Sequence, residues 1–456
     1  MKKNISPWLH QLNHARIHTK LTEDITTDVA IVGAGIAGIS TAFFILKNTD
    51  KKVAVLERFK LAHGATGHNA GQVVSYFEIG FAHLVQEFGV ELATAGQREI
   101  EQAWTLLDEM YTDGGLDIPL SRFVGYAGLV SYEQVLWHLE DSLARQSAGL
   151  EIEPMRICAE EDFVEKIPQK YSGLYSIAPA KEVLATLETK QQKFVAVLSS
   201  QKGCINSALF CQEVLQYLLG KYPERFALYE HTPVRKIILH KDDALLDADT
   251  HTISATRVVL CTNGFENLHI INEHGLEVDA KYHHTLSGKI GYMSGYLETL
   301  NKTPTAISYY TDPTPGPDNS YYYLTRRSYE YEKDTEHNLI SIGGPDLDIE
   351  EKHVYSHEDD YPEEHEQKID EFVREVYDTD PNKKIDYVFT WHGLMGYTKN
   401  KVRLVGIEPQ NQALLYNLGC NGVGILPSIY GGKKIADHVA GKLVAASIFD
   451  VPSKKE

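Results

Sequence analysis

The chain has 456 residues, of which 63 are acidic and 44 are basic, so its formal net charge is −19. This length predicts two or three domains, and the acidic balance argues against a nucleic-acid partner. The five cysteines form no CxxC pair and are odd in number, which argues against a zinc site and a disulfide framework. We therefore expect a globular cytoplasmic protein with reduced thiols and no metal site.

The N-terminal part of the chain has a strand–turn–helix–strand pattern. A strand at Asp28–Val32 leads through a glycine-rich turn into a helix that ends near Lys47, and Lys52–Glu57 is the next apolar strand. The run Val29–Leu46 carries no charge over eighteen residues, which is near the lower limit for a membrane span. Because glycines separate its β-branched start from its helical end, we expect no transmembrane segment.

Hydrophobic periodicity predicts further helices and strands along the chain. Helices are expected at Val90–Tyr111, Ser207–Leu219, Glu363–Tyr377 and about Ser428–Phe449. Strands are expected at Arg257–Cys261, Ala306–Tyr310, Tyr321–Thr325, Leu339–Ile342, Tyr387–Trp391 and Ala413–Leu418. The region from about Lys281 to Leu347 is expected to be antiparallel, because a Pro/Gly/Asp loop joins two of its strands as in a hairpin.

A dinucleotide-binding fingerprint follows the first strand. It is Gly33-x-Gly35-x-x-Gly38, and Glu57 ends the second strand. The first glycine permits a tight turn, the second lets a pyrophosphate approach the backbone, and the third permits close packing of helix on strand. The carboxylate of Glu57 is placed to accept the ribose hydroxyls. This pattern predicts a dinucleotide but does not separate FAD from NAD.

A second loop of small residues follows the ribose-binding strand. It runs from Gly64 to Gln72 as GATGHNAGQ. Here the chain resembles the D-amino-acid oxidase superfamily of flavoenzymes, which includes glycine oxidase, sarcosine oxidase and gamma-glutamylputrescine oxidase. The flavin loop of that family commonly has the sequence G-A-S-G-R-N-x-G-Q, so this chain carries Thr66 for Ser and His68 for Arg. The resemblance implies FAD as the cofactor.

Four more segments are similar to motifs of this family, in the expected order. They are Arg257–Gly264, His231–Val234, Trp391-x-Gly393 with Thr398, and Cys420–Pro427 with Gly431. The family's aspartate and proline after the matching threonine are replaced by Asn400 and Arg403. The resemblance implies FAD contacts from the following residues: Gly33, Gly35, Ile36, Ala37, Gly38, Glu57, Arg58, Ala65, Thr66, Gly67, His68, Asn69, Gly71, Gln72, Val234, Thr262, Asn263, Gly264, Gly393, Asn421, Gly422, Val423, Gly424 and Ile425.

We therefore expect an α/β fold in which a Rossmann-like FAD-binding domain is interrupted by an α+β substrate domain built on an antiparallel sheet. The expected boundaries are 1–115, 202–270 and 386–450 for the FAD-binding domain, 116–201 and 271–385 for the substrate domain, and 451–456 for a tail.

The substrate side departs from the family pattern. Where glycine oxidase and D-amino-acid oxidase have an arginine that clamps the substrate carboxylate, this chain has Met395. Arg326 or Arg327 could replace that arginine, and a solvated pair at a strand end is the alternative. Trp391 and Tyr322 are expected beside the substrate. The tyrosines around Tyr322 could form a pocket for a cationic amine or could simply cover a sheet.

Three residues are candidates for chemistry beside the flavin. Lys289 and His392 are expected near flavin N5 from their places beside family motifs, and ordinary strand roles are the alternative. In sarcosine dehydrogenases the similar loop bonds flavin through a histidine. We expect non-covalent FAD, with a covalent bond through His68 as the alternative. Three more histidines, His353, His357 and His365, lie among carboxylates, where we expect a solvated loop or lid instead of a metal site.

The resemblance implies oxidation of a C–N bond in a small amine or amino acid by hydride transfer to flavin N5, giving an imine. Oxygen or a quinone would then accept the electrons. Two alternatives stay open at this point. One is a 2-hydroxy-acid or glycerol-phosphate dehydrogenase on the same scaffold, and the other is a flavoprotein with structural FAD and a protein-binding role.

Overall fold

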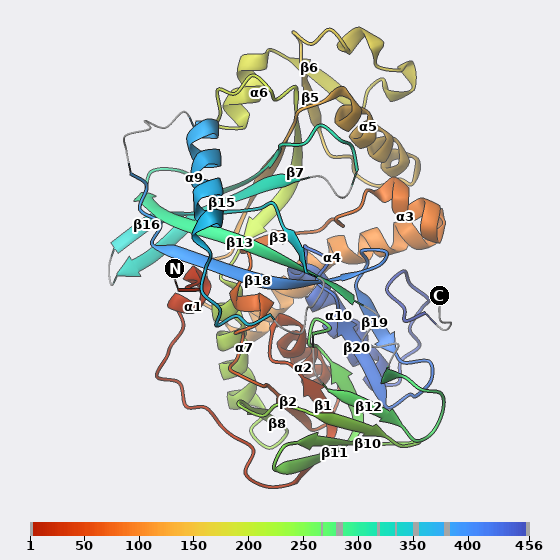
Figure 1. Cartoon of the computed structure of the whole chain (residues 1–456). Coiled ribbons are helices and arrows are strands. Elements are labelled where there is room, and N and C mark those ends of the chain that lie inside the picture. The colour runs from red at the N-terminus through yellow and green to blue at the C-terminus, as the bar shows by residue number, and fades with distance from the viewer. Residues whose placement is uncertain are drawn as a thin grey trace.

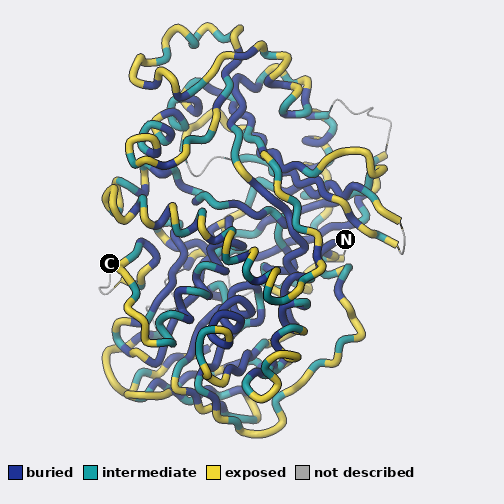
Figure 2. The backbone as a smooth tube through the Cα atoms, turned by 180° about the vertical axis from the view of Figure 1, so that it is seen from behind, coloured by how far each residue is buried: buried dark blue, intermediate teal, exposed yellow. Residues whose placement is uncertain are grey.

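The computed structural model describes residues 3–265, 268–279, 286–316, 320–332, 335–349, 355–377 and 384–452. Two β-sheets with helices packed on them make up this part of the chain, one sheet in the lower half of Figure 1 and the other in the upper half. The buried residues follow the middle of both sheets and the helices between them, whereas the outer loops are exposed (Figure 2).

The first sheet has nine described strands and a parallel centre, in the order β8-β2-β1-β11-β20. The central strands are buried on both faces, which explains their continuous runs of β-branched residues. The strands are β1 (Ile25–Val32), β2 (Val53–Leu56), β8 (Phe226–Tyr229), β9 (Lys236–Leu239), β10 (Ala244–Ala248), β11 (His251–Leu260), β12 (His269–Asn272), β19 (Leu404–Ile407) and β20 (Leu414–Leu418).

The second sheet has eleven described strands, and most of its neighbouring pairs are antiparallel. Its strands are β3 (Gln72–Val74), β4 (Ser121–Leu129), β5 (Met155–Cys158), β6 (Tyr175–Ala178), β7 (Ala196–Cys204), β13 (Leu286–Thr299), β14 (Thr305–Tyr310), β15 (Tyr321–Glu332), β16 (Thr335–Gly343), β17 (Leu347–Ile349) and β18 (Phe389–Thr398). Residues from its face form one wall of the cavity described below.

Helices cover both sheets. The α-helices are α1 (Pro7–His10), α2 (Ile36–Asn48), α3 (Phe81–Phe88), α4 (Val90–Gly114), α5 (Tyr132–Ser147), α6 (Ala180–Thr186), α7 (Ser207–Lys221), α9 (Glu363–Tyr377) and α10 (Ile425–Val439); the 3-10 helices are η1 (Ala65–Gly67), η2 (Val164–Lys166) and η3 (Gln169–Tyr171). Helix α9 buries Ile369, Phe372, Val373 and Val376 at helical spacing, so its apolar side faces the second sheet (Figure 1).

The structure confirms the predicted fold class and most of the predicted elements. The uncharged run Val29–Leu46 forms β1 and α2, and in the described residues no helix is long and apolar enough to cross a membrane. The expected final helix to Phe449 is wrong in its length, because α10 ends at Val439 and Gly441 follows with a φ of 69°. Phe449 is instead buried in the core from an irregular segment, stacked near Phe77.

The predicted domain boundaries stay a prediction, but the two sheets divide the chain slightly differently. Strands β3 and β18 belong to the second sheet, although both fall within the residue ranges expected for the FAD-binding domain. The reason is that each strand finds its backbone partner there, β3 on β7 and β18 on β13. Lys281 and His353 lie outside the described residues.

Candidate active site

A cavity of about 320 Å³ lies between residues of the two sheets. On the side of the first sheet it is lined by the fingerprint loop, the loop after β2, the segment at Thr232–Arg235, and the start of α10. On the side of the second sheet it is lined by residues of β13, β14, β15 and β18 and by Tyr76, Glu78 and Asp346.

The fingerprint glycines are required by close backbone contacts. Gly33 has a φ of 105°, and a Cβ there would lie 2.7 Å from the carbonyl oxygen of Cys261. A Cβ at Gly38 would collide with the carbonyl oxygen of Gly33, which shows how closely α2 packs on the turn. At Gly35 a Cβ would stand 2.9 Å from Thr66 Oγ1, on the cavity surface. These positions form a cradle of bare backbone at the N-terminus of α2.

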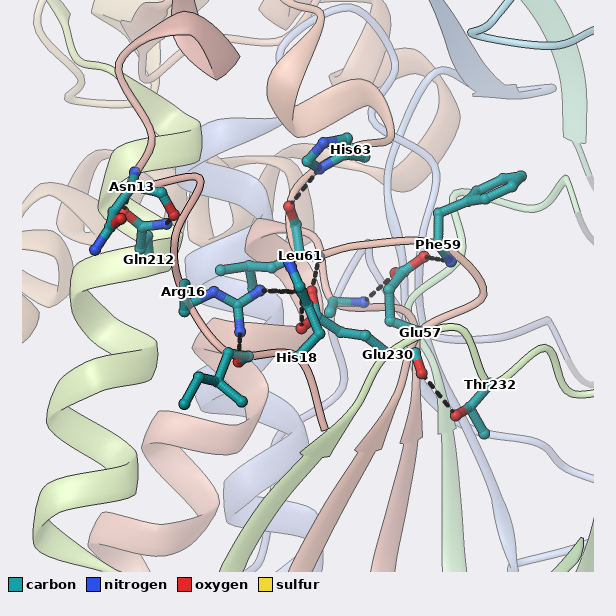
Figure 3. Close-up of polar contacts among 12 residues, drawn as sticks. Asn13, Arg16, His18, Glu57, Phe59, Leu61, His63, Gln212, Glu230 and Thr232 are labelled. Atoms are coloured by element: carbon teal, nitrogen blue, oxygen red, sulfur yellow. Dashed lines mark hydrogen bonds and ion pairs between the residues drawn. The ribbon is translucent and has the colours of Figure 1, made fainter. Parts of the chain in front are cut away.

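Glu57 holds the fingerprint loop in place. Its Oε2 accepts a hydrogen bond from the N–H of Ala34 at 2.9 Å and its Oε1 accepts one from the N–H of Phe59 at 2.8 Å (Figure 3). Burial raises the pKa of Glu57, and these two hydrogen bonds oppose that effect. Glu57 lines the cavity, and its binding of a ribose stays a prediction.

An N-terminal segment is fixed behind the same loop. The buried carboxylate of Glu230 accepts hydrogen bonds from Arg16 at 2.6 Å and from the N–H of Leu61 at 2.7 Å, and lies 2.7 Å from His18 Nδ1 (Figure 3). Burial alone would raise the pKa of Glu230, but these partners outweigh burial and lower it. The loop after β2 is therefore held by an ionised anchor outside the cavity.

The second loop closes over the start of α2. Thr66 Oγ1 accepts the N–H of Ile36 at 2.9 Å, which satisfies a donor that the helix itself leaves unpaired. His68 is buried, and its Nδ1 lies 3.0 Å from the carbonyl oxygen of Gly64. Burial lowers the pKa of His68 to about 3, so its ring is neutral. Because a carbonyl only accepts, Nδ1 carries the proton and Nε2 holds the lone pair.

A family model described as FAD dependent oxidoreductase matches residues 28–438 of the chain. The chain belongs to this family. The resemblance inferred from the sequence motifs is therefore confirmed, and with it FAD as the cofactor of the fold. The cradle at Gly33 and Gly35 fits this cofactor, because it offers bare backbone to a pyrophosphate where a Cβ would obstruct it.

Individual curated relatives match only parts of the chain. The chain is 36% identical to the gamma-glutamylputrescine oxidoreductase of Escherichia coli over 73 residues, which are 16% of this chain and 17% of that protein. The chain spans between 17% and 50% of the length of the three curated relatives that it matches.

Solved structures of low sequence identity share the fold. Glycine oxidase of Geobacillus kaustophilus matches with a TM-score of 0.66 at 17% identity, over 94% of this chain and all of the other. L-proline dehydrogenase of P. horikoshii matches with a TM-score of 0.64 at 14% identity, over 93% of this chain and 95% of the other.

Most of the residues expected to contact FAD line the cavity. These are Gly33, Gly35, Ile36, Ala37, Glu57, Arg58, Ala65, Thr66, His68, Asn69, Gly71, Gln72, Val234, Thr262, Asn263, Gly393, Gly422, Val423, Gly424 and Ile425. Four others stand behind this surface: Gly38, Gly67, Gly264 and Asn421. They pack behind it; for example, a Cβ at Gly38 would collide with the carbonyl oxygen of Gly33, which lines the cavity.

The substrate-side expectations need correction at Tyr322 and Arg326. Because side chains of a strand alternate, Tyr321 and Tyr323 of β15 line the cavity, whereas Tyr322 points to the other face and stacks on Phe372 at 4.0 Å. Arg326 also lies outside the cavity, where its guanidinium makes two hydrogen bonds of 2.7 Å to Glu188.

Arg327 and Trp391 are buried away from the cavity too. Arg327 lies 5.2 Å from the ring of Trp8, and the Trp391 indole donates to the carbonyl oxygen of Asn69 at 3.2 Å. Neither alternative arginine therefore replaces the carboxylate clamp that is missing at Met395, which does line the cavity.

The two residues expected near flavin N5 also lie outside the cavity lining. Lys289 is on β13 and forms a 3.3 Å ion pair with the exposed Asp348. His392 is buried, its Nδ1 lies 3.0 Å from the hydroxyl of Tyr355, and its Nε2 lies 3.0 Å from the carbonyl oxygen of Asp359. Both make structural contacts and neither lines the cavity, and their expected place near flavin N5 stays a prediction.

The segment around His357, which is expected to be a solvated loop or lid, reaches the cavity at His357. His357 lines the cavity, its ring centre is 5.9 Å from that of His68, and it packs edge-on against Phe59 at 4.7 Å. His365 stacks on Tyr292 at 3.8 Å. Within the described residues, no group of three or more His, Cys, Asp or Glu side chains is placed to hold a metal ion.

A wall of tyrosines and carboxyl groups faces the cavity from the second sheet. We call Tyr76, Glu78, Tyr321, Tyr323, Asp346 and Met395 the substrate wall. The Tyr323 hydroxyl donates to Asp346 Oδ1 at 3.1 Å, and the Tyr321 hydroxyl lies 3.4 Å from Glu78 Oε2. Tyr76, Glu78 and Asp346 are not marked in the sequence, because they come from loops that carry no motif of their own.

Both carboxyl groups of the substrate wall have raised pKa values. Burial, together with the charge of Asp346, raises the pKa of Glu78 to about 7. Burial likewise raises the pKa of Asp346 to about 6, against the hydrogen bond from Tyr323. Two carboxyl groups with displaced pKa values in a cavity are a common signature of a functional site.

Arginine is absent from the substrate wall among the described residues. The cavity lining contains Arg58, Arg235 and Arg403, which all come from loops or strands of the first-sheet side. Arg403 is fully engaged, since its guanidinium donates to Asn417 Oδ1 at 2.5 Å and to two backbone carbonyl oxygens. The substrate wall therefore presents carboxyl groups and aromatic rings, a combination that suits a cation.

Proposed function

We propose that the protein oxidises a C–N bond of a small amine, with hydride passing from the substrate α-carbon to the bound FAD. The observation that carries this proposal is the composition of the substrate wall, which offers Glu78, Asp346 and three tyrosines to the ligand. Carboxylates and aromatic faces attract an ammonium group, and the same carboxylates repel the carboxylate of an α-amino acid.

The position of Met395 supports an amine over an amino acid. A Cβ at Gly291 would lie 3.1 Å from Asp346 Oδ1, 3.1 Å from the Tyr323 hydroxyl and 3.3 Å from Met395 Cε, so these three groups converge on one small space. The family resemblance predicts a carboxylate-binding arginine at the Met395 position. Here a methionine takes its place and a carboxyl group stands beside it, which inverts the charge preference.

FAD, when bound, supplies the hydride acceptor of this reaction. The substrate must enter the reaction as a neutral amine, because an ammonium group has no lone pair to support loss of hydride from its carbon. We assign Glu78 to take that proton. Its carboxyl group lies against Gly422, where a Cβ would be 2.9 Å from Glu78 Cγ, in the loop implied to contact the flavin. A pKa of about 7 makes Glu78 an effective proton acceptor near neutral pH.

The remaining steps need little from the protein. Loss of hydride from the neutral amine leaves a protonated imine, which water hydrolyses to a carbonyl compound and ammonia or a smaller amine. Tyr321 supports Glu78 by pointing its hydroxyl at Oε2. Either oxygen or a quinone would take the electrons from the cofactor, and mixing the reduced protein with each acceptor in turn would identify which one reoxidises it.

Anaerobic reduction of the purified FAD-loaded protein tests the proposal. Primary and secondary amines, glycine, D-alanine, 2-hydroxy acids and glycerol phosphate would each be mixed with it and the flavin absorbance followed. We expect amines to bleach the flavin, with glycine and D-alanine at least roughly tenfold slower, because their carboxylate has no cation on the substrate wall. Reduction by hydroxy acids alone would support the dehydrogenase alternative, and reduction by no compound would support structural FAD.

The role of Glu78 has its own test. We expect Glu78→Gln to slow flavin reduction by roughly a hundredfold and to remove the rise of the reduction rate with pH around pH 7. Glu87→Gln, an exposed site on α3, is the matched control and should leave both unchanged. An unchanged pH profile in Glu78→Gln would contradict the assignment.

A further inference from the structure

We propose that Asp346 binds a second, non-reacting ammonium group, so that the preferred substrates are diamines or longer polyamines. This inference rests on the proposed function and goes further, because it divides the substrate wall into a reacting end at Glu78 and a binding end at Asp346.

The two carboxyl groups have different neighbours. Glu78 lies against Gly422, in the loop at the start of α10. Asp346 lies at the β13 side of the cavity, where its Oδ1 approaches Gly291 and accepts the Tyr323 hydroxyl. The charge of Asp346 raises the pKa of Glu78, so the two groups are close enough to interact electrostatically. A ligand with two nitrogens can reach both, whereas a monoamine can neutralise only one.

Asp346 has no cation of its own at contact distance. In the parts of the chain that the structure describes, no lysine or arginine nitrogen forms an ion pair with it, and the nearby Lys289 is paired with Asp348. A carboxylate that is largely removed from water and has no cationic partner is costly, and a ligand ammonium group would remove that cost. Tyr323 and Tyr321 add aromatic faces beside the same space, which favour an ammonium ion further.

The charged groups around this pair set the expected pH dependence. The charges of Asp346, Lys202 and Lys401 shift the pKa of Glu78. The charges of Lys289 and Asp348 shift the pKa of Asp346. Burial lowers the pKa of Lys202 to about 8, and its Nζ lies 5.6 Å from the ring centre of Tyr76, behind the substrate wall. Above about pH 7 both carboxyl groups are ionised, so diamine binding should tighten as the pH rises from 5.5 towards 7.5.

Binding is best measured where turnover cannot occur. In the fully reduced FAD-loaded protein, kept free of oxygen, an amine binds but has no oxidised cofactor to reduce. Calorimetric titration with diaminobutane, butylamine and gamma-aminobutyrate then compares four-carbon amines that carry a second ammonium group, no second charge and a carboxylate. We expect diaminobutane to bind about tenfold more tightly than butylamine, and gamma-aminobutyrate to bind least.

Asp346→Asn tests the assigned residue. We expect it to reduce the preference for diaminobutane over butylamine from about tenfold to about twofold while butylamine binding changes little. Asp117→Asn is the control for loss of one aspartate charge, because Asp117 is exposed and lies outside the cavity lining. If Asp346→Asn does not fold, Tyr323→Phe serves instead, because it removes the hydrogen bond that lowers the pKa of Asp346. The tightening of diaminobutane binding should then require a higher pH than in wild type, and an unchanged pH dependence would contradict the assignment.

The outcomes separate the inference from the proposed function. Equal affinity of the wild-type protein for diaminobutane and butylamine, or tighter binding of gamma-aminobutyrate, would overturn the inference even if amines reduce the flavin. A preference for diaminobutane that Asp346→Asn leaves intact would overturn the assignment to Asp346. A preference that Asp346→Asn abolishes, in a protein whose flavin no amine reduces, would support the binding site and contradict the oxidation chemistry.

Discussion

Trp8 and Trp391 donate their indole N–H groups to the same acceptor, the backbone carbonyl oxygen of Asn69, at 2.5 and 3.2 Å. Their rings meet edge to face with centres 6.4 Å apart. Trp8 also fills the space beside Gly71, where a Cβ would lie 2.7 Å from its ring. A residue from the N-terminal segment and a residue from β18 therefore fix the flavin loop from behind.

This shared acceptor predicts an effect of Trp8→Phe on cofactor retention. Phenylalanine keeps an aromatic ring against Gly71 but lacks the N–H group, so we expect FAD to bind about fivefold more weakly, corresponding to about 1 kcal/mol. The measurement is the dissociation constant of FAD from fluorescence titration of the apoprotein. Trp104→Phe is the control, because Trp104 lies on α4 against Arg122 and away from the cavity lining. Equal FAD affinity in Trp8→Phe and wild type would contradict the role of Trp8.

A second prediction concerns the fingerprint. Gly35→Val should abolish FAD retention, because a Cβ there would lie 2.9 Å from Thr66 Oγ1, and the branched side chain would occupy the cradle where a pyrophosphate is expected. The flavin content of the purified variant is the measurement. Gly220→Val is the control, since a Cβ at this exposed glycine of α7 would meet no atom within 4 Å. A folded Gly35→Val protein with one FAD per chain would contradict the role of Gly35.

The FAD side of the cavity could be predicted from the sequence because its chemistry depends on backbone conformation. Gly33 has a φ of 105°, and a Cβ at Gly38 would collide with the carbonyl oxygen of Gly33, so a local motif carries this information. Thr66 accepts the N–H of Ile36 from 30 residues away, and the similarity of its loop to the family motif indicates it. Even so, Gly38 acts by packing behind the cavity and not by lining it.

The substrate side could not be predicted in the same way because its residues meet only through the fold. The alternation along β15 does not show which face turns to the cavity, and Tyr321 and Tyr323 line it while Tyr322 does not. The charge of Arg326 is neutralised by Glu188, which is 138 residues away in the sequence. Asp346 reaches the cavity from a loop after β16, and no local pattern marks it.

The raised pKa of Glu78 predicts a dependence of stability on pH. The folded chain holds the Glu78 proton more tightly than the unfolded chain, so between pH 4.5 and about 7 the folded state binds more protons. The free energy of unfolding therefore falls as the pH rises through this window. Glu78→Gln removes the cost of ionising this carboxyl group in the folded state. We therefore expect the Tm of the variant to exceed that of wild type by about 2 °C at about pH 8 and to match it near pH 4.

Thermal unfolding of both proteins across this pH range checks the prediction. Glu87→Gln, exposed on α3, provides the control for loss of one charge. The opposite pattern, with Glu78→Gln less stable than wild type at high pH, would mean that the ionised carboxylate stabilises the fold and that the pKa of Glu78 is not raised.

The last prediction concerns how FAD is attached at His68. In the neutral ring the Nδ1–H group donates a hydrogen bond to the Gly64 carbonyl oxygen. Nε2, which holds the lone pair, is therefore the ring nitrogen able to form a bond to a flavin carbon. We nevertheless expect non-covalent FAD, because bond formation demands a far narrower geometry than a polar contact. Acid precipitation of the purified protein should therefore leave all the yellow colour in the supernatant. His68→Ala should still bind FAD, only a few fold more weakly, since one polar contact is lost. A fluorescent flavin that stays with the denatured chain in wild type and is lost in His68→Ala would instead establish the covalent bond.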